Sequence, residues 1–117
     1  MTVEELRELA LALPGTTEDI KWGEHLCFSV GGKLFLITSP DTFPPTAAFK
    51  VPEAIFEETI SKEGFTRQKH LGRYHWINLE DISYLSPKEW ITSINQSYEL
   101  VVARLSKKQK KELNLAK

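Results

Sequence analysis

Cysteine is almost absent from this chain: Cys27 is the only one among its 117 residues. One thiol cannot form an internal disulfide, and it excludes the multi-cysteine frameworks that hold structural zinc. Because free cysteines are among the most frequently buried side chains, we interpret Cys27 as a buried structural thiol. A reactive nucleophile is the alternative, although the sequence assigns no base to it.

Long apolar runs are missing as well. The amino terminus does not show the basic, apolar and small-residue order of a secretory leader, and Glu4, Glu5 and Glu8 interrupt its apolar residues well short of a membrane-spanning length. We therefore expect a cytoplasmic protein that makes no membrane contact.

Catalytic motifs are also lacking. There is no nucleophile elbow, kinase signature, dinucleotide fingerprint or zinc motif, and Gly31-Gly32 has neither the spacing nor the following helix of a phosphate-binding loop. The separations of His25, His70 and His75 match no standard set of zinc ligands. We predict a non-enzymatic protein without metal site or cofactor, while catalytic groups assembled from residues far apart in the sequence stay open.

The composition is that of one globular domain. A chain of 117 residues buries one substantial core but hardly two, and three tryptophans in 41% apolar residues argue against disorder. We predict a single, monomeric domain over residues 1–117. For Trp22 a core position and a groove-lining position are equally open, and Trp76 is assigned to neither face of its strand.

Helix signals stand near both ends of the domain. Each is a capping box followed by apolar residues at helical spacing, a pattern that satisfies free amides of the first turn and gives the helix one apolar stripe. We predict a first helix that ends at Pro14-Gly15 and a last helix over residues 87–104 that buries Trp90 and Tyr98. The two boxes are Thr2 with Glu5 and Ser86 with Glu89.

Alternation with a period of two takes over between these helices. Gly31-Gly32 tolerates positive φ and so suits the tight turn of a hairpin. A short helix between Pro52 and Gly64 separates this hairpin and one further strand from the later strands. The order predicts an α+β fold, a two-layer sandwich with helices packed on one face of a mainly antiparallel sheet. The predicted strands lie at about residues 26–30, 33–37, 46–50, 65–67 and 74–78.

Charge is unevenly distributed although the formal net charge is only −1. The first stretch is acidic, whereas the last carries Arg104 and a group of lysines against Glu112. We treat residues 106–117 as a basic tail that can meet an anion. Ser106 caps one or two helical turns there, or the tail is partly disordered because little apolar surface holds it down.

Five short segments, spread in order over nearly the whole chain, match a known family pattern. They are Met1 to Arg7, Leu13 to Asp19, Val30-Gly31-Gly32-Lys33, His75-Trp76, and Ser97 to Val101. Together they resemble the YjbR/MmcQ family. The resemblance implies a CyaY-like α/β sandwich and a proposed nucleic-acid-binding role through a double-wing arrangement of sheet loops. Where members commonly have Asn-Lys-Lys-His-Trp-Asn, this chain has Gly72 to Asn78, which removes one basic position but keeps the His-Trp pair.

The resemblance directs attention to basic residues in the predicted loops. Lysine and arginine neutralise phosphates and release counterions, and an exposed aromatic ring can stack on a base. We therefore predict weak, largely sequence-independent binding of nucleic acid, DNA in the first place, through wing loops. The candidate contacts are Lys33, Arg67, Lys69, His70, Arg73, His75 and Trp76, with Tyr74 as a further stacking ring if it is exposed.

Two other interpretations stay open. The basic residues can be an ordinary solvated surface and the aromatic residues core, which the slightly negative total charge favours. Alternatively, the domain is an interaction module with no nucleic-acid role, which binds a protein or a small metabolite in a groove between helices and sheet or along a sheet edge. Basic side chains gathered on one face favour phosphate binding, and scattered ones favour the interaction module.

Overall fold

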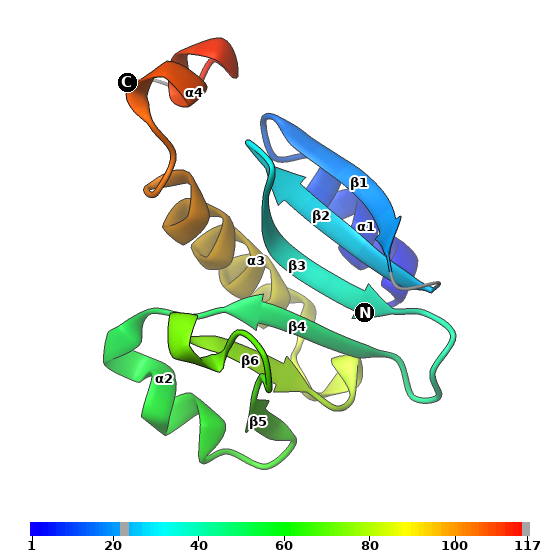
Figure 1. Cartoon of the computed structure of the whole chain (residues 1–117). Helices are drawn as coiled ribbons and strands as arrows, with labels where there is room; N and C mark the ends of the chain where they lie inside the picture. The colour runs from blue at the N-terminus through cyan, green and yellow to red at the C-terminus, as the bar shows by residue number, and fades with distance from the viewer. Residues whose placement is uncertain (22–23, 116–117) are drawn as a thin grey trace.

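The computed structural model describes residues 1–21 and 24–115, which form two layers (Figure 1). Trp22 and Lys117 lie outside the described residues. Six strands make a single sheet in the order β1-β2-β3-β4-β6-β5, and every neighbouring pair is antiparallel. The predicted α+β sandwich is confirmed. The strands are β1 Thr16–Lys21, β2 His25–Val30, β3 Lys33–Ser39, β4 Thr46–Lys50, β5 Phe65–Arg67 and β6 Trp76–Leu79.

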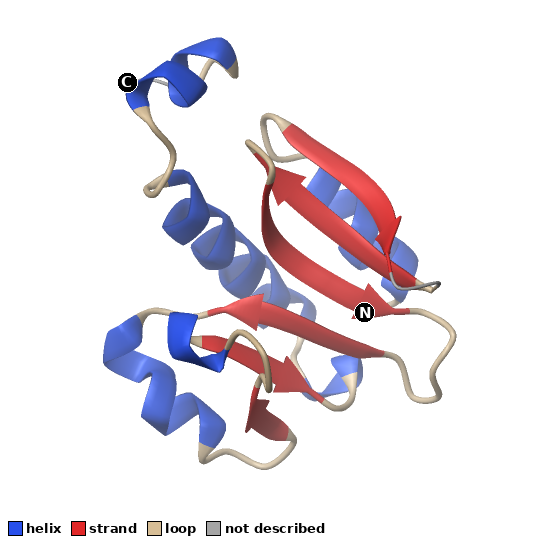
Figure 2. Ribbon diagram, viewed as in Figure 1, coloured by secondary structure: helices blue, strands red, loops and turns tan. Residues whose placement is uncertain are grey.

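Helices cover one face of the sheet and leave much of the other face open (Figure 2). α1 contacts β1, α3 packs across β2, β3 and β4, and α2 lies beside β5 and β6. Within the described ranges, no helix combines the length and the apolar character needed to cross a membrane. The helices are α1 Val3–Leu11, α2 Glu53–Ile60, α3 Pro87–Val102 and α4 Lys107–Glu112, with 3₁₀ turns at Gly72–Tyr74 and Ile82–Tyr84.

Both predicted capping boxes are present. The Thr2 hydroxyl accepts the Glu5 amide at 3.1 Å, and the Glu5 carboxylate accepts the Thr2 amide at 2.9 Å. Ser86 and Glu89 repeat this pair of bonds at 3.2 and 2.9 Å. Each box satisfies two backbone donors that a helix start leaves without partners. α3 ends at Val102, two residues before the predicted end.

The core lies between the sheet and the apolar stripes of α1 and α3. Trp90 is fully buried, and its indole N–H donates to the Ile82 carbonyl at 2.8 Å. Tyr98 packs edge-on against Phe35 with ring centroids 5.4 Å apart, and its hydroxyl donates to the Pro14 carbonyl at 2.6 Å. The prediction that Trp90 and Tyr98 belong to the core is therefore confirmed, and each buried polar tip has a partner.

An irregularity in β3 lets α3 hold two strands together. β3 carries one extra residue, Phe35, relative to its partner β2. Ser97 on α3 is fully buried, and its hydroxyl donates to the Phe35 carbonyl at 2.6 Å. The same hydroxyl accepts the Lys50 amide at 3.0 Å. A helix side chain thus bridges β3 and β4 where these strands make no direct bond.

The last strand begins later than predicted. Tyr74 and His75, expected in a strand over residues 74–78, instead form part of the 3₁₀ turn and the left-handed residue after it, where φ is 67°. Their amides each donate to a carbonyl three residues back at 2.9 Å. These local bonds take the place of ladder bonds, so β6 starts only at Trp76.

The carboxyl-terminal segment is better anchored than its composition suggested. Ser106 and Gln109 form a third capping box, with both bonds at 3.1 Å. Leu113 and Leu115 pack against the core, and the Gln109 side-chain amide donates to the Gly31 carbonyl at 3.3 Å. The expectation that little apolar surface holds this segment was wrong. The apolar contact comes from the two leucines, which follow the lysine-rich helical turn.

Candidate nucleic-acid interface

The antiparallel topology brings several element ends to one end of the domain. β3 begins there at Lys33, β4 finishes at Lys50, and the chain enters β6 shortly after Arg73. Lys50 stands opposite Trp76 in the register of β4 and β6. Arg104 follows α3 and lies close enough for its charge to act on Lys50. Cations that are far apart in the sequence therefore share one end of the sheet.

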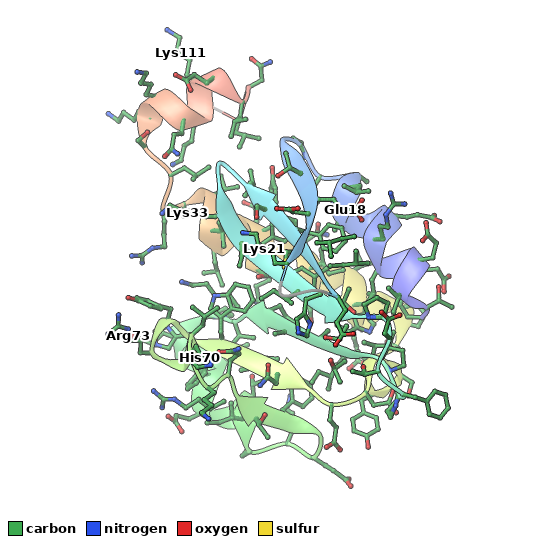
Figure 3. All side chains as sticks on the ribbon, turned by 45° about the vertical axis from the view of Figure 1, so that its right-hand side comes forward. Glu18, Lys21, Lys33, His70, Arg73 and Lys111 are labelled. Carbon is green, nitrogen blue, oxygen red and sulfur yellow. The ribbon has the colours of Figure 1, made fainter. Side chains whose placement is uncertain are left out.

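α4 adds lysines to the same end. The bond from Gln109 to the Gly31 carbonyl holds α4 beside the turn between β2 and β3, where Lys33 lies. Figure 3 shows Lys33, Arg73 and Lys111 on one side of the molecule. We call this surface the basic end, and it consists of Lys33, Lys50, Arg73, Arg104, Lys107, Lys108, Lys110 and Lys111.

Within the described part of the chain, no carboxylate forms an ion pair with a cation of the basic end. Across the described residues, side-chain ion pairs of 4.0 Å or less involve only Arg7 and His75 as cationic partners. Burial, and then the charge of Arg104, lowers the pKa of the Lys50 ammonium. The smaller contribution, from Arg104, shows that two cations act on each other at this spot, and a bound anion would relieve this repulsion.

The opposite end of the sheet is acidic. Glu80 and Asp81 follow β6, Glu63 precedes β5, and all three act on Tyr84. The Tyr84 hydroxyl donates to the Glu80 carboxylate at 3.2 Å, and this bond, with the nearby negative charges, raises the tyrosine pKa. Charge is thus separated along the domain although the total is only −1.

Four of the predicted contacts are exposed at or next to the basic end: Lys33 at the start of β3, Lys69 and His70 in the loop after β5, and Arg73 in the 3₁₀ turn before β6. The Arg73 guanidinium lies over the Tyr74 ring, 4.8 Å from its centroid, and donates to its hydroxyl at 2.7 Å. Tyr74 is 42% exposed, so the additional stacking ring is at the surface. Arg73 and Tyr74 thus present a stacked cation and ring at the surface of the basic end.

The other three predicted contacts have partners within the protein. Arg67 is exposed, but its guanidinium lies 5.7 Å from the centroid of the Phe56 ring. His75 is half-buried, edge-on to the same ring, with Nε2 3.8 Å from a Glu53 carboxylate oxygen. Trp76 is only 5% exposed. Its indole offers no free face to a base, which corrects the prediction for this residue.

Sequence reasoning left Lys50 and Arg104 out of the site. Each was visible as a basic residue, but one ends a strand and the other follows a helix more than fifty positions later. Their proximity depends on β4 lying in the middle of the sheet, with α3 crossing behind it. The sequence did show that Lys50 ends a predicted strand. That position indicates a place in the basic end only when the strand order is known.

Cys27 and the three histidines were the remaining candidates for chemistry in the sequence. Cys27 is 1% exposed, which confirms that the thiol is buried, and desolvation raises its pKa. Over residues 1–21 and 24–115, no three His, Cys, Asp or Glu side chains gather in a way that could hold a metal ion.

The open face of the sheet contains a hollow of about 940 Å³ over β3, β4 and β6. Small side chains at its centre, Ser39, Thr46 and Ala48, leave the space, and the loop at residues 68–71 forms one wall. A groove between helices and sheet was one prediction for an interaction module. That space is instead occupied by the core, and the hollow lies on the other face.

Solved structures with this fold include two bacterial proteins. The crystal structure of a Deinococcus radiodurans protein with a DUF419 domain matches with a TM-score of 0.86 at 24% identity, over 97% of this chain and 88% of that one. A crystal structure from Pseudomonas syringae matches with a TM-score of 0.70 at 19% identity, over 86% of this chain and 99% of that one. At these identities the likeness shows the fold alone. No curated protein matches the chain at a significant level.

The comparison with protein families is more specific. The YjbR family model matches residues 11–100, a span that contains the whole sheet, α2 and most of α3. It also contains the turn with Lys33 and the loop with Arg73, which are the wing positions of the sequence-based prediction. The chain therefore belongs to the YjbR family.

Proposed function

We propose that this protein binds nucleic acid, DNA in the first place, through its basic end, weakly and largely without sequence preference. The supporting observation is that lysines and arginines from distant parts of the chain gather at one end of the sheet, without carboxylate partners within 4.0 Å among the described residues. Such gathering favours phosphate binding over a merely solvated surface.

The chemistry of the basic end fits a phosphate backbone. Lysines act as flexible point charges, and contacts to phosphate position a protein on nucleic acid without reading its sequence. Lys33 at the start of β3 and Arg73 in the 3₁₀ turn before β6 are the cations of the two segments that we propose as the wings. Arg73, stacked on the exposed Tyr74, presents a planar fork that matches phosphate geometry.

The acidic end limits the affinity. A total charge of −1 means that a polyanion is attracted to one end of the protein and repelled from the other. Attraction through a small number of phosphate contacts is strongly reduced by salt. We accordingly propose that binding of nucleic acid is measurable at low ionic strength. We also propose that the domain is monomeric, non-catalytic and cytoplasmic.

The test is fluorescence anisotropy with a labelled duplex and a labelled single strand at several salt concentrations. The informative variant carries Lys33→Gln with Arg73→Gln. The matched control carries Lys62→Gln with Lys88→Gln, which removes the same charge near the acidic end, where Lys62 acts on Glu89. Because each phosphate contact contributes about 0.9 to the slope of log affinity against log salt, the first variant should lower that slope by about 2.

The control variant should keep the slope of the unmodified protein. Equal losses in both double variants would mean that total charge, and not the basic end, governs binding. Absence of binding to either probe at low salt would overturn the proposal and leave a protein or a small metabolite as the partner.

A further inference from the structure

The hollow on the open sheet face is built into the strand pattern. Ser39, Thr46 and Ala48 point to the same face from neighbouring strands, since Ser39 pairs with Thr46 and the side chains alternate along each strand. Their small side chains leave space where larger ones would fill it. The hollow therefore follows from the choice of small residues and does not require any movement of the chain.

The loop at residues 68–71, which forms one wall of the hollow, is fixed by the side chain of Gln68. The side-chain Oε1 of Gln68 accepts the backbone amides of His70 and Leu71, both at 2.7 Å. The backbone of Gln68 also donates to the Trp76 carbonyl at 3.1 Å, which fixes the loop to β6. His70 and Leu71 consequently line the hollow from one side. The cavity has a formed wall before any ligand arrives.

The lining combines apolar surface with polar groups at the edge. Leu34, Ile37 and Leu71 provide apolar contact, while Asn78, Thr66 and Glu80 provide an amide, a hydroxyl and a carboxylate. A volume of about 940 Å³ is at the upper end of the range of small-ligand sites. A flat ring with apolar faces and a hydrogen-bonding edge fits this lining, and a nucleobase has that chemistry.

The hollow extends along the sheet from Glu80 at the acidic end to Leu34 next to the basic end. Leu34, in its lining, directly follows Lys33, and Lys50 lies two residues after Ala48 on the same face of β4. Two residues along a strand span roughly 7 Å. A ring in the hollow therefore has Lys50 on its own face of the sheet, within reach of a phosphate attached to that ring.

We propose that the hollow receives an unstacked base of a single-stranded nucleic acid whose phosphates lie on the basic end. This inference rests on the proposed function and adds a preference to it. The bases of a duplex are paired and stacked, so a duplex reaches the basic end only with its backbone. A single strand gains both phosphate contacts and the base contact, and it binds more tightly than a duplex of equal length at the same salt.

The test compares a labelled 12-nucleotide thymidine strand with a labelled 12-base-pair duplex in anisotropy titrations of the full chain. Ala48→Ile fills the floor of the hollow with a residue that suits a strand and leaves every charge unchanged. Ser29→Ile, on the same open face of β2 but outside the lining, is the matched control. Circular dichroism and thermal melting verify that both variants are folded.

We expect Ala48→Ile to weaken binding of the single strand about tenfold, the scale of one lost base contact, and to leave duplex binding unchanged. Ser29→Ile should change neither. An independent readout on the unmodified protein is the nuclear magnetic resonance signal of the Ala48 methyl and the Asn78 side-chain amide, which should shift with the single strand and not with the duplex.

Three results would overturn the inference in different ways. If both probes bind with equal, salt-dependent affinity and Ala48→Ile changes neither, the hollow has no role and the basic end alone binds phosphate. If thymidine monophosphate shifts the Ala48 signal at millimolar concentration while the 12-nucleotide strand does not, the ligand is a free nucleotide. If neither nucleic acid binds at low salt, the proposed function fails together with the inference.

Discussion

The buried hydroxyl of Ser97 accepts the backbone amide of Lys50 at 3.0 Å. Because the same hydroxyl donates to the Phe35 carbonyl, one side chain satisfies two buried backbone groups on different strands. Lys50 belongs to the basic end, so the position of a surface cation is set by a bond inside the core.

Replacing this hydroxyl should destabilise the fold. Ser97→Ala leaves an amide and a carbonyl without partners, and we expect the free energy of unfolding in urea to fall by about 1–3 kcal/mol. Ser93→Ala, one turn earlier on α3 and without a buried bridging role, should change it by less than about 0.5 kcal/mol. Similar losses for both variants would show that the bridge contributes little.

The turn between β2 and β3 should distinguish its two glycines. Both have positive φ, 59° at Gly31 and 78° at Gly32, so an alanine at either costs about 1–2 kcal/mol. A Cβ at Gly31 would also stand 2.7 Å from a methyl of the buried Leu105, whereas none of the atoms described lies within 4 Å at Gly32. Gly31→Ala should therefore lower the melting temperature more than Gly32→Ala, and equal shifts would mean that Leu105 moves aside freely.

Glu89 should make stability depend on acidic pH. Its carboxylate accepts the Ser86 amide, and this bond is the main reason that its pKa lies below the ordinary value of 4.5. A lowered carboxyl pKa stabilises the fold above 4.5, and this contribution disappears as the pH falls through the folded pKa.

The measurement is urea unfolding of the unmodified protein and of Glu89→Gln from pH 7 down to pH 3. The advantage of the unmodified protein should be largest near neutral pH and vanish in acid. Glu8→Gln, at an exposed position inside α1, should show no such convergence. A difference that is independent of pH would contradict the role of the charge.

The anchoring of α4 should be visible by limited proteolysis. Leu113 is half-buried, packs against the core and lies near Gly15. Leu113→Ala should speed trypsin cleavage after the lysines of α4 several-fold, with a loss of roughly 1–2 kcal/mol in unfolding free energy. Glu112→Ala, at the neighbouring exposed position, is the control. Unchanged cleavage would mean that the helix is held by other contacts.

Local chemistry made much of this fold predictable. The capping boxes at Thr2 and Ser86 depend only on residues three positions apart, and the hairpin depends on Gly31-Gly32, so both could be identified from neighbours in the sequence. His75 was predicted in a strand but lies in a turn, because its amide donates to the Gly72 carbonyl. The alternation of residue types in the sequence does not indicate such a bond.

The candidate site was predictable only in part, because it depends on strand order. Exposed residues such as Lys33 and Arg73 were found, because turns and loops can be recognised from glycines and clusters of polar residues in the sequence. Arg104 acts electrostatically on Lys50 although the two residues are more than fifty positions apart, and Trp76 is buried although its polar neighbours in the sequence gave no sign of it. The hollow has the same origin, because small residues on separate strands make a cavity only once those strands are neighbours.

The separation of charge along the sheet makes this nearly neutral protein an electric dipole. On the proposed function, a polyanion would exert a torque on such a molecule at a distance of about a Debye length, roughly 10 Å in 0.1 M salt, and would turn Lys33 and α4 toward itself before any contact forms. Encounters are then oriented in advance, so the association rate at low ionic strength exceeds what a net charge of −1 would allow.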